Sequence, residues 1–380
     1  MHCHPLVLRL ELEAFAFVRR LCYLGAVSQP IHTLSSVLAG GAFAVDALFL
    51  LMSGVCDKIL VEEPDIGLCL FVDDLTLHAE GQSSSGVGEQ LARTSQRCID
   101  ILEDDLGLVV SRGLAGKKTI ALHSGLPQQV SMKLSKRLRQ QGIGLARQAK
   151  LLGVDFSAGK RVKRSVQRSR IRKVCKRVNR VRQLGKRAAR HIIKTGAGPG
   201  MRYGVAVYGA TSSAIRTARS FSCGAMGEMR GRSTFARLSL ANYDVGALMA
   251  TDPITHWAKV VWDRLVPKDD LRETWKQAMV KVAVAQRPFG AVIGPAGAFV
   301  ASARRIGWQV PSPFHLQMQD GTLLCLDEVA PTVVQMLASR ALMHLEAQSS
   351  SLASRIGGPP DLEPLKEFLH TQRAPKLPRP

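Results

Sequence analysis

Hydrophobic residues recur every three or four positions in two stretches of the first half of the chain. These are EQLARTSQRCIDILEDDLGLVV (89–110) and MKLSKRLRQQGI (132–143), and the spacing predicts two amphipathic helices, the first of which ends near Gly107. A third stretch, SSVLAGGAFAVDALFLLMSGVC (35–56), is apolar almost throughout and nearly long enough to cross a bilayer. Asp46 lies in its middle and would be costly in lipid, so we interpret this stretch as a helix buried in a protein core.

Short apolar runs with the character of strands lie between these helices. Two of them, 68–72 and 75–79, flank an acidic pair and predict a β-hairpin. A strand is expected within GKKTIALHSG (116–125), and a strand with a turn within AKLLGVDFSAG (149–159). Helices and short strands therefore alternate up to Gly159, which is typical of an α+β fold.

Charge changes the picture from Lys160 onward. The chain carries 52 Lys and Arg against 30 Asp and Glu, a net charge of +22, and no acidic residue lies between Asp155 and Glu228. From Lys160 to Arg190 the apolar residues again recur every three or four positions. This pattern predicts one amphipathic helix with a cationic face, ended by Pro199 and the nearby glycines.

The cationic face predicts a polyanionic partner. RNA and DNA come first, because Lys and Arg side chains that neutralise phosphates release counterions, and the resulting affinity has no sequence preference and falls with salt. A membrane surface is an alternative that we do not expect, and a nuclear localisation signal is compatible with the same residues. The first residues lack a signal-peptide core, so the expected location is nuclear or cytoplasmic. The predicted nucleic-acid-binding residues are Lys160, Arg161, Lys163, Arg164, Arg168, Arg172, Lys173, Lys176, Arg177 and Arg180.

Asp73 and Asp74 stand side by side between the two apolar runs of the hairpin. Adjacent carboxylates repel each other more strongly as the dielectric falls, and a bound divalent cation removes that repulsion. Two hard oxygen ligands suit Mg²⁺, or Mn²⁺, and such a site can support phosphoryl transfer. The alternative is a solvated Asp-Asp turn without a ligand, since both residues tolerate turn geometry.

The tetrapeptide from Phe71 to Asp74 resembles the Y/F-x-D-D palm motif of reverse transcriptases, with Phe71 at the aromatic position. Three neighbouring segments are similar to the family in the same order. SVLAGGAFAVDALFLLM resembles the glycine turn and long palm helix, LGLVVSRGLAGKKTIAL the strand-turn-strand that follows, and AKLLGVDFS the primer-grip hairpin of retroelements without long terminal repeats. The basic residues from Lys160 lie where such enzymes carry their thumb. The resemblance covers residues 35–211.

The resemblance implies a role for several residues. Asp73 would be a metal ligand with Asp74 beside it, and Mg²⁺ or Mn²⁺ the cofactor. Gly40 and Gly41 would shape the loop against the template and the incoming nucleotide, and Lys118 would lie near the triphosphate. Two alternatives also remain open: the glycines simply form the turn at the start of a helix, and Lys118 is a solvated lysine at a turn.

Two features depart from the family pattern. The glycine turn reads LAGGAFA, without the Pro-Gln-Gly type of sequence that many relatives carry. The third carboxylate of a palm would have to come from upstream, where only Glu11 or Glu13 is available and about forty residues are too few for a fingers subdomain. We therefore expect part of a polymerase, inactive alone. The alternative is a non-enzymatic basic nucleic-acid-binding protein in which the hairpin is structural.

The expected architecture is α+β, with a helical thumb-like region and a mostly helical C-terminal region. In the last part, Trp257, Trp262, Trp275 and Trp308 are expected to anchor helix packing, and His256 is expected to be structural. The oligomeric state is not indicated by any pattern. The expected regions are 1–159 as a partial palm, 160–231 as the basic thumb-like region, 232–358 as unassigned, and 359–380 as a disordered proline-rich tail.

Overall fold

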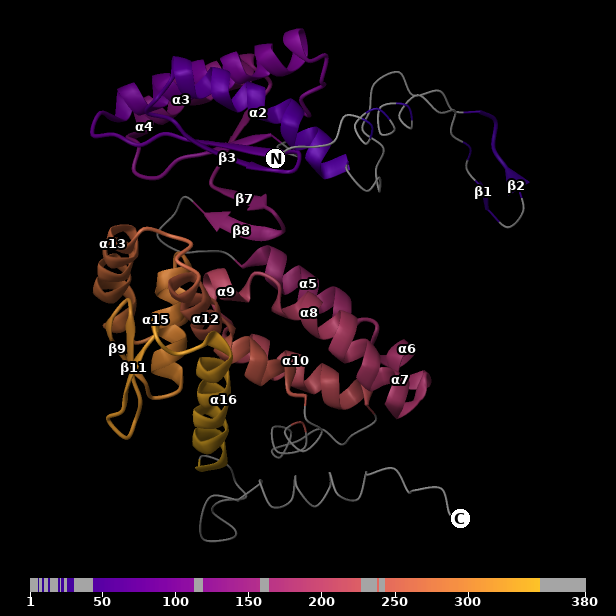
Figure 1. Ribbon diagram of the computed structural model, residues 1–380, viewed down its shortest axis with the longest axis vertical. Coiled ribbons are helices and arrows are strands. Elements are labelled where there is room, and N and C mark those ends of the chain that lie inside the picture. The colour runs from indigo at the N-terminus through magenta and orange to yellow at the C-terminus, as the bar shows by residue number, and fades with distance from the viewer. Residues whose placement is uncertain are drawn as a thin grey trace. The chain divides into compact units, whose positions relative to one another are not determined.

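The computed structural model describes residues 44–112, 119–157, 164–226 and 243–348, together with scattered residues before 31 and Leu238 (Figure 1). The chain divides into two compact units, Met1–Ala146 and Arg147–Pro380. Both units combine helices with small sheets of two or three short strands, so the α+β prediction is confirmed at this level. Each unit is described by itself.

The described part of the first unit pairs a hairpin with three helices. The hairpin is β3 (Gly67–Phe71) with β4 (Asp74–His78), antiparallel, as the apolar runs predicted. The two amphipathic helices predicted from spacing are also confirmed, and Gly107 takes a left-handed φ of 63° shortly after the first. The other elements are β1 (Cys22–Tyr23), β2 (Ala26–Val27), α2 (Ala44–Glu62), α3 (Ser84–Asp100), the π-helical turn η1 (Ile101–Asp105), β5 (Ile120–Leu122), α4 (Gln128–Gln140) and β6 (Gly144–Ala146), with β5 parallel to β6.

Two small hydrophobic clusters hold these elements together. In one, Val55 and Ile59 of α2 pack with Cys98 of α3, and the inward leucines of the hairpin lie against them. In the other, Ile99 of α3 packs with Leu138 of α4. Two bidentate ion pairs join the end of α2 to α3, from Arg97 to Glu62, the last residue of α2, and from Arg93 to Glu63, the residue after it.

The apolar helix α2 is buried along one side only, which differs from the fully buried helix we expected. Met52, Val55 and Ile59 are buried, whereas Phe49 and Leu50 are more than half exposed. Among the helices that the structure describes, none combines the length and the apolar character needed to cross a bilayer.

The second unit begins with another antiparallel hairpin and continues mainly as helices. The expected strand and turn within 149–159 form β7 (Gln148–Leu151) and β8 (Val154–Ser157). The elements that follow are α5 (Ser165–Cys175), α6 (Val178–Gln183), α7 (Gly185–Ile192), η2 (Ile193–Ala197), α8 (Gly198–Arg202), α9 (Val205–Tyr208), α10 (Ser212–Ala225), α12 (Val245–Trp262), α13 (Lys268–Ala278), η3 (Met279–Ala283), α14 (Pro288–Ala291), α15 (Pro295–Arg305), β9 (Gln309–Ser312), β10 (His315–Gln317), β11 (Leu323–Cys325) and α16 (Pro331–Gln348).

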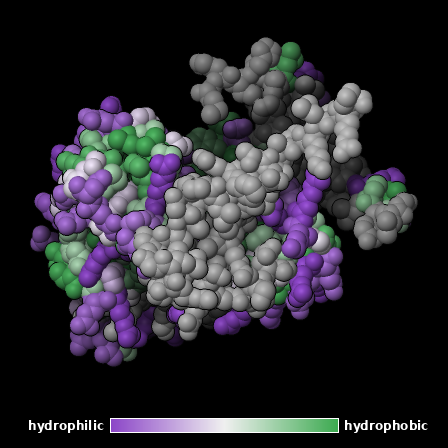
Figure 2. All heavy atoms as spheres, turned by 90° about the horizontal axis from the view of Figure 1, so that it is seen from below, coloured by the Kyte–Doolittle hydropathy of each residue, from purple (hydrophilic) through white to green (hydrophobic). Residues whose placement is uncertain are grey.

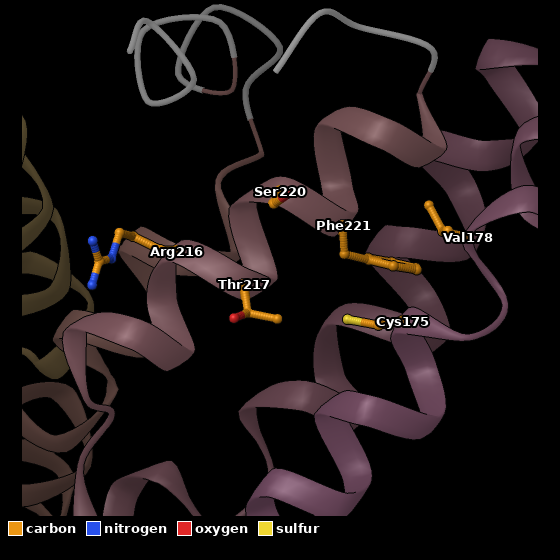
Figure 3. A pocket seen from close by; sticks show the side chains of 6 residues that line it. All are labelled: Cys175, Val178, Arg216, Thr217, Ser220 and Phe221. Atoms are coloured by element: carbon orange, nitrogen blue, oxygen red, sulfur yellow. The ribbon is translucent and has the colours of Figure 1, made fainter. Parts of the chain in front are cut away.

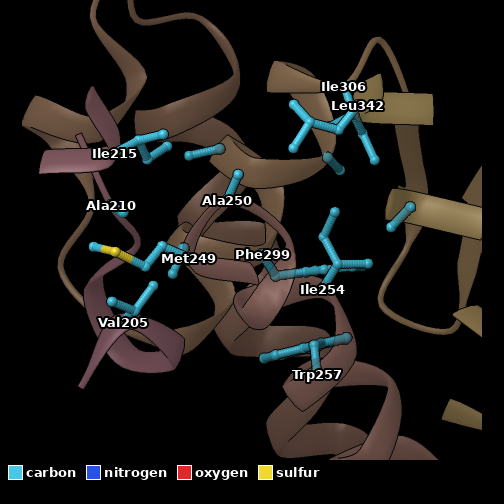
Figure 4. Packing of buried hydrophobic residues seen from close by; sticks show 14 of the residues in the cluster. Val205, Ala210, Ile215, Met249, Ala250, Ile254, Trp257, Phe299, Ile306 and Leu342 are labelled. Carbon is cyan, nitrogen blue, oxygen red and sulfur yellow. The ribbon is translucent and has the colours of Figure 1, made fainter. Parts of the chain in front are cut away.

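One hydrophobic core runs through the second unit, with α12 at its centre (Figure 4). Trp257 stacks on Phe299 of α15, with ring centroids 5.2 Å apart and planes within 8°, and its indole N–H donates to the carbonyl of Pro313 at 2.8 Å. Trp257 and Trp308 are thus the buried anchors that the sequence predicted, and Trp275 packs partly buried against the same core, whereas Trp262 is 42% exposed. Burial lowers the pKa of His256, which lies next to this core on α12.

The region boundaries differ from those predicted. The division lies at Ala146/Arg147, before the hairpin β7–β8, because that hairpin packs on α5. Described residues of 160–231 and of 232–358 contribute to one hydrophobic core, which runs from Ile171 to Leu342. The C-terminal part also contains the three-stranded sheet β11-β10-β9, which hydrophobic spacing did not indicate. The proline-rich tail lies outside the described residues.

The predicted single basic helix is three helices. The chain turns at Lys176–Arg177 between α5 and α6, and α7 begins at Gly185, which takes a left-handed φ of 82°. Pro199 does not end the helical stretch but lies in the first turn of α8, where a missing N–H costs nothing. The helices still share the alternation of buried apolar and exposed basic side chains that the spacing indicated.

Candidate nucleic-acid interface and acidic hairpin

The turn of the β3–β4 hairpin consists of Val72 and Asp73. Phe71 pairs with Asp74 across the strands, so only two residues connect them. Val72 has a φ of 57°, in the left-handed region that β-branched residues rarely adopt. Such a conformation costs about 1–3 kcal/mol and persists where the surroundings impose it, often at functional sites. Asp73 is therefore held at the tip and Asp74 at the start of β4.

The two carboxylates of this turn face solvent. Asp73 and Asp74 are exposed, and neither makes an ion pair with another residue that the structure describes. The ring of Phe71 is 57% exposed beside them, while Leu75 on β4 packs inward. Two exposed carboxylates can bind a Mg²⁺ ion that keeps most of its waters. Within the described ranges, no group of three or more His, Cys, Asp or Glu side chains is placed to hold a metal.

Several predicted site residues lie outside the part of the chain that the structure describes. They include the two glycines of the apolar segment and the lysine expected near a triphosphate. Of the two upstream glutamates, Glu13 is described; it pairs with Arg9 at 3.0 Å, and both side chains are exposed. The residues not described are Glu11, Gly40, Gly41, Lys118, Lys160, Arg161 and Lys163.

Basic side chains cover the outer sides of α5, α6 and α7. All but one of the predicted binding residues that are described here are exposed, and none of those exposed residues forms an ion pair with a described residue. On the face shown in Figure 2, long hydrophilic side chains project where α6 and α7 lie. Cationic groups without carboxylate partners are free to neutralise phosphates. The exposed set, named here the basic surface, comprises Arg168, Arg172, Lys173, Lys176, Arg177 and Arg180.

Arg164 does not belong to this surface, contrary to the prediction. It is 9% exposed, and its guanidinium donates to the carbonyls of Tyr208 at 2.8 Å and Phe289 at 2.6 Å. Burial, and secondarily the charge of Arg168, lowers the pKa of Arg164. The side chain joins α5, α9 and α14 within the second unit and is not available to a phosphate in this structure.

Asp155 is a residue whose role sequence reasoning missed. It is 3% exposed and accepts hydrogen bonds from the backbone N–H groups of Val166 and Gln167, in the first turn of α5. The side chains of Gln148 and Ser165 donate to the same carboxylate at 2.8 Å. A carboxylate at a helix N-terminus satisfies unpaired N–H groups and complements the helix dipole. A signal was present, because Asp155 is the last acid before the basic stretch.

Arg170 and Tyr203 were also missed. Arg170 donates to the carbonyls of Gly153 at 2.7 Å and Tyr203 at 3.0 Å, and its guanidinium lies 4.8 Å from the centroid of the Tyr203 ring. The Tyr203 hydroxyl donates to the carbonyl of Leu152 at 2.6 Å. Leu152 and Gly153 both have positive φ in the β7–β8 turn. Arg170 and Tyr203 therefore fix this tight turn against α5.

Comparison with known proteins adds no relative. No protein-family model, curated protein or solved structure matches the chain. What the chain does must therefore be inferred from the exposed acidic turn, the basic surface and the residues that position them.

Proposed function

We propose that the chain is a piece of a retroelement RNA-directed DNA polymerase, in which the β3–β4 hairpin belongs to the palm and α5–α7 belong to the thumb. The order of elements supports this proposal. A long helix (α2), the hairpin with Phe71 to Asp74, a helix (α3), a strand (β5), a second hairpin (β7–β8) and basic helices occur in the order of that family's motifs, with α4 and β6 between β5 and β7.

The observation that carries the proposal is the exposed pair of adjacent carboxylates, Asp73 and Asp74, at the end of the β3–β4 hairpin. Asp73 and Asp74 would bind Mg²⁺ or Mn²⁺, and the metal would supply charge neutralisation for a phosphoryl group. The hairpin would contribute one carboxylate from each aspartate, and the remaining ligands would be waters or substrate phosphates.

Isothermal titration calorimetry with Mn²⁺ tests the metal site. We expect one weak binding event that disappears in Asp73→Asn and in Asp74→Asn. The matched control is Asp65→Asn, which removes another exposed turn carboxylate just before β3 and should leave the binding unchanged. Absence of Mn²⁺ binding, or equal loss in all three variants, would contradict the polymerase proposal.

A second function is favoured by the basic surface itself. Its exposed Lys and Arg side chains, without ion-pair partners among the described residues, can hold a nucleic-acid backbone whatever the hairpin does. The chain would then be a non-enzymatic nucleic-acid-binding protein. Nucleic-acid binding that persists in a chain without Mn²⁺ binding would favour this function over the polymerase.

A further inference from the structure

A pocket of about 460 Å³ lies beside the basic surface, between α10 and the α5–α6 junction (Figure 3). It lies within the second unit, where α10 packs against both helices. The volume falls in the range of about 300–1,000 Å³ that small-molecule sites occupy. Its lining residues are Cys175, Val178, Arg216, Thr217, Ser220 and Phe221.

The pocket has an apolar side and a polar side. The Phe221 ring points toward Val178, and the Cys175 sulfur lies on the side of Thr217 (Figure 3). Thr217 donates its hydroxyl proton to the Ser213 carbonyl at 2.9 Å, and the Ser220 hydroxyl has no hydrogen-bond partner among the residues described. A flat ligand with apolar faces and a polar edge matches this division, and a nucleobase has that form.

Charge around the pocket selects an anion. Lys176 and Arg177 directly follow Cys175 in the chain, and Arg180 follows Val178 on α6. Arg216 lines the pocket through the part of its side chain nearest α10, and its guanidinium extends away from Phe221 (Figure 3). No acidic residue occurs in this part of the chain, between Asp155 and Glu228. A base in the pocket would thus carry its phosphates over cationic side chains.

We propose that this pocket is a single-nucleotide subsite that receives an unpaired base from a strand lying on the basic surface. The inference rests on the nucleic-acid binding proposed above and adds a preference for single strands. A duplex keeps its bases stacked and paired and can offer only its backbone, whereas a single strand can insert a base. The basic stretch has no aromatic residue, and Phe221 of α10, which is 3% exposed and belongs to the hydrophobic core, forms the floor of the pocket rather than a free stacking surface.

Fluorescence anisotropy with a labelled oligouridine and with a labelled RNA duplex tests the subsite. We expect the wild-type chain to bind the single strand more tightly than the duplex. Ser220→Trp fills the pocket from its partly exposed rim, so this variant should lower the ratio of single-strand to duplex affinity about tenfold. Ser212→Trp places the same ring on an exposed position of α10 outside the lining and should keep the ratio. An unchanged ratio in Ser220→Trp would overturn the subsite.

A second measurement needs no variant. Mass-spectrometric alkylation of the native chain should show Cys175 protected by saturating oligouridine but not by duplex, while the partly exposed Cys325 of β11 reacts equally in both. Equal reactivity of Cys175 with both ligands would overturn the inference while leaving nucleic-acid binding intact. Failure of the chain to bind either RNA would overturn both the inference and the proposed nucleic-acid binding.

Discussion

The carboxylate of Asp155 accepts the backbone N–H of Val166 through both of its oxygens, each at 3.0 Å. This contact joins the last acidic residue before the basic stretch to the first turn of α5. The contact holds the N-terminus of α5, on which the basic surface lies. Because Asp155 is buried, it does not compete with phosphates for the exposed basic side chains.

Replacement of Asp155 by Ala should therefore destabilise the second unit. Loss of the helix-capping interaction, together with the unpaired donors of Val166, Gln148 and Ser165, should lower the free energy of unfolding by about 2 kcal/mol. Urea unfolding followed by circular dichroism measures the change. The exposed Asp263 at the end of α12 offers a control, and Asp263→Ala should change stability by less than about 0.5 kcal/mol. Equal effects of the two variants would contradict the capping role.

Arg219 of α10 holds together two acidic residues from distant parts of the second unit. Its guanidinium donates to Asp244 at 2.8 Å and to Glu346 at 2.7 and 2.8 Å, and the side chain is 11% exposed. Burial alone would lower the pKa of Arg219, but the charge of Asp244 and hydrogen bonds to Glu346 and Asp244 outweigh it and raise the pKa.

Arg219→Met should thus take the guanidinium away from both carboxylates and cost about 3–5 kcal/mol. Thermal and urea unfolding of the purified variant measure this cost. Arg216→Met, on the same helix but exposed, should cost less than about 0.5 kcal/mol. A near-neutral effect of Arg219→Met would show that the three side chains do not form the network described here.

Cys98 of α3 provides a pH-dependent test of the first unit. Burial, and secondarily the neighbouring Cys56, raises the pKa of the Cys98 thiol to about 11, from 9.0 in its ordinary state. The folded thiol thus keeps its proton to a higher pH than the unfolded thiol. The stability that this group contributes is complete below pH 9.0 and is lost as the pH rises toward 11.

Alkylation at about pH 8 should modify the exposed Cys69 of β3 rapidly and leave Cys98 unmodified until the unit unfolds. Peptide mass spectrometry resolves the two sites. Urea unfolding at increasing pH should show a falling free energy of unfolding above pH 9.0, and Cys98→Ala should reduce that fall. Equal alkylation rates for Cys69 and Cys98 in the native chain would contradict the buried position.

Local patterns in the sequence predicted the elements that local physics determines. The β3–β4 hairpin followed from two short apolar runs around a turn, and α3 and α4 from apolar residues three or four apart. In each case one side of the element is buried and the other is solvated, so the period is visible in the chain itself.

The residues and breaks that the sequence did not predict depend on partners far away in the sequence. Arg164 is in the core because its acceptors include the Phe289 carbonyl, 125 positions further along the chain, which no helical period can indicate. The breaks between α5, α6 and α7 arose at Lys176–Arg177 and at Gly185, where short helices keep the same apolar spacing as one long helix. The sheet of β9, β10 and β11 was missed because its strands have three or four residues, and β9 contains Pro311.

The most direct test of the central claim, that the basic surface binds a nucleic-acid backbone, is the salt dependence of affinity. Anisotropy with a labelled DNA duplex between about 50 and 200 mM salt gives the slope of log affinity against log salt. We predict a steep negative slope whose magnitude decreases by about 2 when Lys173 and Lys176 are both changed to Gln, because two phosphate contacts are lost. The same exchange at the exposed Lys276 and Lys281, which removes equal charge elsewhere in the second unit, should leave the slope unchanged. An equal decrease in both double variants, or a slope near zero in the unaltered chain, would contradict the claim.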